Sequence, residues 1–173
     1  MRHNIFNEIH TPVRIALLNA SVVLQHEGSL NAGETIKKMS AIIHLLNQQL
    51  MNEEQFILPL IFDYEPAVWD MYTRQHYKTK NQLRELNVLI HLYEKAELEE
   101  EKDYYASSIK DTFHYMMINN YHHMDDEEEV LNEILWRHYS DALLVQIKNQ
   151  LQTLPVPASH ARERKFLQTA YAA

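Results

Sequence analysis

Apolar residues recur at intervals of three and four along most of the chain, which is the pattern of helices that bury one face. In the first 30 residues this spacing involves Ile5, Ile9, Val13, Ala16, Leu17 and Ala20. The same periodicity continues through three further segments. It predicts four long helices, which cover residues 4–28, 34–62, 66–98 and 104–136.

The segments between these helices are short and polar. Residues 29–33 have the composition of a turn, Pro66 suits the first turn of a helix, and the acidic residues 99–103 form a solvated connection. Helices joined by short connections pack antiparallel to their neighbours. We therefore expect an all-α protein built as an up-down-up-down four-helix bundle.

A shorter helix over residues 141–154 follows the fourth long one and ends before Pro155, and a last helix is expected over 159–171. The chain contains no internal repeat and no low-complexity segment. We expect one domain overall, with the bundle in residues 1–137 and a C-terminal helical extension, residues 138–173, packed on it.

Composition narrows the class of function. The chain has 16 Lys and Arg against 24 Asp and Glu, a formal net charge of −8, which argues against a nucleic-acid partner. It has no cysteine, so disulfides, thiolate zinc sites and Cys-ligated iron–sulfur clusters are excluded. No apolar stretch is long enough for a signal core or a membrane span, and we expect a cytoplasmic protein without a membrane partner.

The run from Tyr121 to Leu131 carries the clearest chemical signal. His123 and Glu127 stand four residues apart, so on an α-helix they share one face and could grip a single cation. A histidine nitrogen with a carboxylate oxygen suits Fe, Mn or Zn better than Ca or Mg. The alternative for this pair alone is an acidic, solvated helix face.

Ligand-type residues on the other helices distinguish a metal site from a solvated helix face. In an antiparallel bundle the start of the first helix, the end of the second, the start of the third and the end of the fourth meet at one end. Counted from that end, His10, Glu53, His76 and the His123–Glu127 pair differ in depth by no more than seven residues, about 10 Å at 1.5 Å per residue. The sequence therefore predicts one metal site made by all four helices.

Four other histidines fail the same test. His26 and His91 lie about 22 to 24 Å along their helices from His10 and His76. His44 and His114 face roughly the opposite side of their helices from Glu53 and His123. We expect them on the surface or elsewhere in the bundle. Tyr72 and Tyr115 are expected near the centre as core residues with hydrogen-bonded hydroxyls.

Several motifs around these residues are familiar as a set. They are His10 with Arg14 four residues on, the acidic pair and apolar run that lead into proline at 53–59, the Gln75–His76 pair, and the stretch 123–131. Together they resemble the hemerythrin-like, or HHE cation-binding, domain family, whose members are four-helix bundles that hold non-haem iron. The likeness extends into the tail and is closest to bacterial cytosolic members.

The resemblance implies that His10, Glu53, His76, His123 and Glu127 hold one or two iron ions, with Mn or Zn as alternatives. Glu53 and Glu127 would bridge or terminally ligate the metal, and Asp126 or Glu54 would orient the imidazoles from outside.

Two positions depart from the family. Gln49 stands where the second helix usually carries a histidine, and an amide oxygen is a poorer ligand than imidazole. Lys80 stands where the oxygen carriers have a second third-helix histidine, and its charge repels a metal unless it points away.

The sequence thus favours a non-enzymatic metalloprotein that handles or senses dioxygen, peroxide, nitric oxide or labile iron. No nucleophile–base pair, phosphate loop or basic cleft suggests an enzyme. The alternative is a metal-free, degenerate bundle that acts as an interaction module or a homodimer, with an apolar tail that contains Phe166, Leu167 and Tyr171.

Overall fold

The protein is all-helical in a computed structural model that describes residues 2–26 and 32–153. No strand occurs in this part of the chain. All four segments with long apolar periodicity are helical, with bounds α1 (Asn7–His26), α2 (Ala32–Phe56), α4 (Pro66–Lys95) and α5 (Glu99–Asp126). The shorter elements are α3 (Leu58–Phe62), the π-helical turn η1 (Glu127–Leu131), α6 (Asn132–His138) and α7 (Asp141–Thr153).

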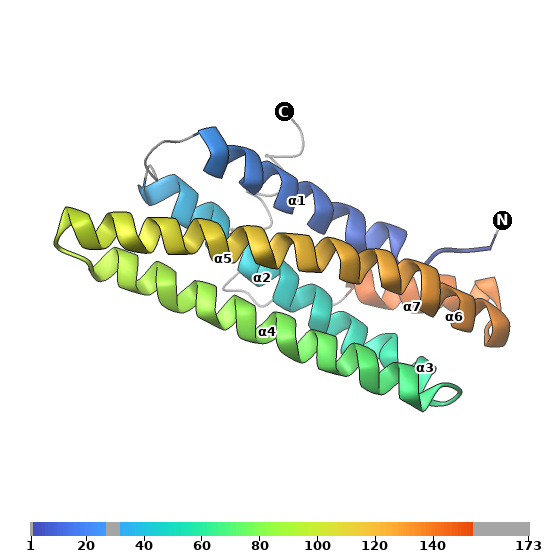
Figure 1. Cartoon of the computed structure of the whole chain (residues 1–173). Helices are drawn as coiled ribbons and strands as arrows, with labels where there is room; N and C mark the ends of the chain where they lie inside the picture. Colours follow the sequence, from blue (N-terminus) through green and yellow to red (C-terminus); the bar gives the residue numbers. More distant parts are fainter. Residues whose placement is uncertain (1, 27–31, 154–173) are drawn as a thin grey trace.

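The four long helices lie side by side (Figure 1). Helix α1 packs against α2 and α5, and α4 packs against α2 and α5. The start of α1, the end of α2, the start of α4 and the end of α5 lie at the same end of the molecule (Figure 1). This arrangement brings the four segments that carry the predicted ligands together.

The second predicted helix is not continuous. It ends at Phe56, and α3 begins at Leu58 after the single residue Ile57. Pro59 explains the break, because proline has no N–H and its ring clashes with the carbonyl four residues earlier. The prediction of one helix over 34–62 was therefore wrong at this point, and Glu53 lies in the last turn before the break.

The predicted acidic connection over residues 99–103 is also wrong. These residues form the first turn of α5, and only residues 96–98 separate it from α4. Glu99, Glu100 and Glu101 are stabilised there because the helix dipole favours negative charge at its N-terminus.

The fourth predicted helix changes its winding within the acidic run. Residues Glu127–Leu131 form a π-helical turn between α5 and α6. A π turn displaces backbone hydrogen bonds, and here the side-chain Nδ2 of Asn132 donates to the Glu128 carbonyl at 2.9 Å. Such turns are frequent at functional sites.

In the part of the chain that the structure describes, two apolar clusters make up the core. The first joins the four long helices through residues such as Val13, Leu46, Leu83 and Phe113. The second joins the N-terminal segment to α3, α6 and α7 and includes Phe6, Ile61, Leu135 and Leu144. Along the first part of the chain, buried His10 stands between Phe6 of one cluster and Val13 of the other. His76 likewise stands between Tyr72 of the second cluster and Leu83 of the first, and Glu53 stands between Leu50 of the first and Ile57 of the second, so the polar layer separates the two apolar clusters.

Helix α7 packs against α2 and supplies three buried apolar residues to the second cluster, Leu144, Ile147 and Leu151. The predicted helix over 159–171 and the apolar tail residues lie outside the described residues. Within residues 2–26 and 32–153, no helix has the length and apolarity needed to cross a membrane.

Candidate metal centre

The five residues predicted as ligands come together in the interior. His10 comes from α1, Glu53 from the last turn of α2, His76 from α4, His123 from the last turn of α5, and Glu127 from the first position of η1. Four of the side chains are 0% exposed and His123 is 6% exposed. Burial of a carboxylate or an imidazole costs free energy unless the side chain has a polar partner, so each of the five side chains needs one.

The inward imidazole nitrogens all face the two central carboxylates. His10 Nε2 lies 3.0 Å from Glu53 Oε1 and 3.3 Å from Glu127 Oε2. His76 Nε2 lies 3.6 Å from Glu53 Oε2 and 3.3 Å from Glu127 Oε1. His123 Nε2 lies 3.4 Å from Glu127 Oε1. Each carboxylate thus directs one oxygen to His10 and the other to His76.

Four of these residues fit around a common point. One ligand atom from each of Glu53, His76, His123 and Glu127 lies within 4.8 Å of the other three. Two ligands each about 2.1 Å from a tetrahedral ion lie roughly 3.4 Å apart. The observed nitrogen-to-oxygen distances of 3.3 to 3.6 Å match that separation, so the cluster could hold a transition-metal ion.

The outward imidazole nitrogens are held as well. His10 Nδ1 lies 2.9 Å from Glu128 Oε1, and His76 Nδ1 lies 3.3 Å from Glu54 Oε1. His123 Nδ1 lies 2.7 Å from Gln75 Oε1, an acceptor that fixes the hydrogen on Nδ1. In neutral His123 the lone pair is therefore on Nε2, toward the centre, as a metal requires.

The imidazoles of His10 and His76 each contact three carboxylates. Burial alone would lower the pKa of His10, but hydrogen bonds with Glu127, Glu128 and Glu53 outweigh it and raise the pKa to about 11. Burial likewise lowers the pKa of His76, and its contacts with Glu127 and Glu54 outweigh that effect and raise it to about 9. Without metal, both imidazoles are protonated at neutral pH and balance the carboxylates.

Glu127 is ionised despite complete burial. Burial would raise its pKa, but the neighbouring imidazoles of His123, His10 and His76 outweigh this and hold the pKa below the usual range. Within residues 2–26 and 32–153, three polar atoms of the cluster have no hydrogen-bond partner, namely Glu53 Oε2, His123 Nε2 and Glu127 Oε2. Buried polar atoms without partners are rare in proteins, and a cation in the cluster would give such atoms a partner.

The two residues that depart from the family pattern have clear positions. Gln49 is buried, and its amide nitrogen donates to Glu53 Oε1 at 3.0 Å. Lys80 points away from the centre and pairs with both oxygens of Glu54, at 2.7 and 2.6 Å. The contacts with His76 and Lys80 outweigh partial burial and lower the pKa of Glu54 to about 2. Lys80 therefore supports the outer shell of the site instead of repelling a metal.

A second outer ion pair lies on the opposite side of the cluster. Arg14 contacts Glu128 through Nη1 and Asp125 through Nη2. The same Glu128 oxygen also contacts His10. Arg14 thus fixes the carboxylate that orients His10, in the same way that Lys80 fixes the one that orients His76.

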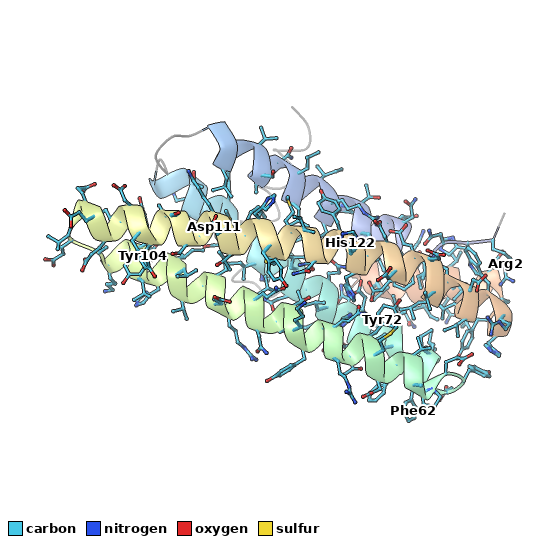
Figure 2. All side chains as sticks on the ribbon, in the orientation of Figure 1. Arg2, Phe62, Tyr72, Tyr104, Asp111 and His122 are labelled. Carbon is cyan, nitrogen blue, oxygen red and sulfur yellow. The ribbon has the colours of Figure 1, made fainter. Side chains whose placement is uncertain are left out.

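The structure separates the other histidines from this cluster. His44 is partly buried, and the exposed ones are His91, His114, His122 and His138. His122 is labelled on α5 in Figure 2. The rings of His138 and Tyr64 stack with centroids 3.7 Å apart. The side chain of His26 lies outside the described residues.

Both predictions for tyrosines need correction. Tyr115 is 57% exposed instead of central, and it lies 5.7 Å beneath the Lys78 ammonium. Tyr72 is fully buried on α4 (Figure 2), but its hydroxyl has no hydrogen-bond partner. Its ring centroid lies 5.9 Å from that of His123, so it forms part of the wall beside the cluster.

Sequence reasoning missed two of the three outer contacts. Glu54 was expected to orient an imidazole and does so, whereas Asp126 is exposed and Glu128 takes that role. Glu128 could not be found from α-helical spacing, because it stands about 100° from Glu127 on an α-helix. The position of Gln75 directly before His76 indicated that it lies near the site. The sequence did not indicate that it contacts His123 on α5.

No family model, no curated protein and no solved structure matches this chain. The function is therefore inferred from the geometry of the cluster.

Proposed function

We propose that this chain is a hemerythrin-like metalloprotein that holds iron, with Mn or Zn as alternatives, in the cluster formed by His10, Glu53, His76, His123 and Glu127. In this proposal α1, α2, α4 and α5 are the four helices of an up-down-up-down bundle. The site would handle or sense a small molecule such as dioxygen, peroxide or nitric oxide, or it would handle labile iron. The imidazole and carboxylate side chains of the cluster determine which metals it could bind.

One observation carries the proposal. All three imidazoles direct Nε2 toward the buried Glu127 carboxylate, and two of them also toward Glu53. Each imidazole has its Nδ1 held from outside by Glu128, Glu54 or Gln75. Metal-binding histidines nearly always have such an outer partner, because it fixes the tautomer and the ring orientation. A bundle core that merely tolerated these residues would not need three separately oriented imidazoles.

The ligand set favours a transition metal of intermediate softness. Imidazole and carboxylate together suit Fe, Mn and Zn, and no thiolate is available because the chain lacks cysteine. Bound iron would supply redox chemistry and an affinity for small oxygen- or nitrogen-containing ligands. Tyr72 and the two apolar clusters would keep bulk water away from that chemistry.

Metal content after anaerobic purification tests the proposal. The wild-type protein should carry iron in a stoichiometric amount or take it up from Fe²⁺. Glu127→Gln should abolish uptake, because it removes the carboxylate that contacts all three imidazoles. The matched control is Glu129→Gln, which changes an exposed carboxylate two residues away. Wild-type protein without metal, before and after incubation with Fe²⁺, would refute the proposal.

One observation favours the second candidate, a metal-free interaction module. Two inward imidazoles already have carboxylate partners, since His10 Nε2 lies 3.0 Å from Glu53 and His76 Nε2 lies 3.3 Å from Glu127. The cluster can thus balance its own charges. Under this function Glu127→Gln would change the free energy of unfolding, and wild-type and variant protein would both lack metal.

A further inference from the structure

The geometry points to a single divalent ion, bound between His76, His123, Glu53 and Glu127, with His10 and Gln49 as hydrogen-bond partners and not as ligands. This inference rests on the proposed metal-binding function and sets its stoichiometry. The ligand types alone left one or two ions open, and the positions of individual oxygens decide between them.

The two carboxylates divide the cluster into two sides. On the first, here called the four-ligand side, Glu53 Oε2 and Glu127 Oε1 face His76. Glu127 Oε1 also faces His123. On the second, here called the His10 side, Glu53 Oε1 and Glu127 Oε2 face His10.

The four-ligand side has a complete set. Two imidazole nitrogens and two carboxylate oxygens make the four ligands of a tetrahedral ion, and their residues form the group whose ligand atoms lie within 4.8 Å of one another. Two of these atoms, Glu53 Oε2 and His123 Nε2, have no hydrogen-bond partner among the described residues. They are therefore available to an ion without the loss of an existing bond.

The His10 side has only one imidazole, and the residue beside it cannot complete a set. Gln49 directs its amide nitrogen at Glu53 Oε1, because a carboxylate oxygen accepts hydrogen bonds and an amide oxygen could not donate one. The N–H hydrogens repel a cation, and the bond occupies the oxygen that would bridge to a second ion. His10 Nε2 lies 3.0 Å from that same oxygen.

The charges lead to the same stoichiometry. Glu53 and Glu127 supply two negative charges, and a single divalent ion already cancels both. The outer carboxylates cannot balance a second ion, because Glu54 is paired with Lys80 and Glu128 with Arg14. Two further positive charges at a site with 0% exposed carboxylates would be left without compensation.

Titration with Fe²⁺ under anaerobic conditions, and separately with Co²⁺, followed by desalting and elemental analysis, tests this stoichiometry on the full chain. We expect one ion per chain in the wild type. Gln49→Glu should take up a second ion, because it supplies the missing ligand and one negative charge. The matched control, Gln48→Glu, changes a neighbouring α2 residue that does not contact Glu53 in the described hydrogen bonds and should still bind one ion.

Each outcome can be assigned. Two ions in the wild type would overturn the inference and leave the proposed function intact, whereas no ion in the wild type would overturn the proposed function itself. A folded Gln49→Glu variant that still binds one ion would overturn the role given to Gln49.

A comparison of two histidine variants locates the ion independently. His123→Gln should weaken Co²⁺ binding at least a hundredfold, because it removes a ligand. His10→Gln should weaken it about tenfold, the smaller effect typical of a residue that orients ligands. Equal losses in the two variants, or a larger loss for His10→Gln, would overturn the location on the four-ligand side. Circular dichroism of both variants checks that they are folded.

Discussion

Raising the pH should destabilise the metal-free protein and strengthen metal binding. The relevant groups are His10 and His76, whose folded pKa values are about 11 and about 9 against an ordinary value of 6.5. A raised pKa in the folded state stabilises the protein fully below the unfolded pKa, and that stabilisation disappears as the pH rises toward the folded pKa. Both histidines therefore lose their contribution between pH 6.5 and 9, and His10 continues to lose it up to about pH 11.

The magnitude follows from proton counting. Between pH 7 and 8 both imidazoles are protonated when folded and mostly neutral when unfolded. Each bound proton contributes about 1.4 kcal/mol per pH unit, so the metal-free protein should lose roughly 3 kcal/mol over this interval. The carboxylates act at lower pH with the opposite sign, because the pKa values of Glu54 and Glu127 are lowered and their stabilisation is lost as the pH falls below about 4.5. The metal-free protein should therefore be most stable between about pH 4.5 and 6.5.

Urea unfolding of the metal-free protein, followed by circular dichroism at several pH values from 5 to 9, measures this effect. His10→Gln should remove about half of the slope between pH 7 and 8, and the exposed His122→Gln should leave it unchanged. Binding of Co²⁺ should instead strengthen about tenfold per pH unit from 6.5 to 7.5, because one proton leaves His76 Nε2. A free energy of unfolding that stays constant or rises from pH 7 to 8 would refute the charge balance inferred for the cluster.

Two further predictions concern the outer shell and the core. Glu54→Gln should weaken metal binding about 10- to 100-fold, because it removes the carboxylate that orients His76, while the exposed Glu133→Gln should have no effect in the same Co²⁺ titration. Leu46→Ala should lower the free energy of unfolding by about 2 to 5 kcal/mol in urea, since Leu46 is fully buried in the first apolar cluster, without changing the number of ions bound.

The long helices could be predicted because their signal is periodic and local. The spacing of residues such as Val13 and Leu46 marks the buried face of each helix, and both are buried in the structure. The errors came where local rules compete. Pro59 ended a helix that the apolar pattern continued, and Glu99 began one where the charge pattern suggested a connection. In both cases the effect of one or a few residues on the backbone determined where the helix ended or began, and the surrounding pattern of apolar or charged residues did not.

The inner residues of the site could be predicted from depth along the helices, but their individual contacts could not. Depth depends on the rise per residue, which accumulates little error over a few turns. Whether Glu128 or Asp126 contacts an imidazole depends instead on the winding of η1. The contact of Gln75 with His123 depends on how α4 and α5 are rotated relative to each other. Gln49 was expected to be a poor ligand. The structure shows in addition that its amide nitrogen donates a hydrogen bond to one oxygen of Glu53.

The position of the cluster between two apolar clusters bears on whether folding needs metal. A chain of 173 residues can bury enough apolar surface to fold without a metal ion. The centre of the polar layer contains the two carboxylates of Glu53 and Glu127. In the metal-free state the pKa values of His10 and His76 are raised, so both imidazoles are protonated and their two positive charges balance the carboxylates. An incoming divalent ion that displaces the proton from His76 changes the charge of the layer by only one unit. Under the proposed function, metal binding would therefore be an exchange of cations inside a folded protein, and removal of the metal by a chelator should leave the helical circular dichroism spectrum unchanged. Loss of helical structure on chelation would show instead that the ion holds the two clusters together.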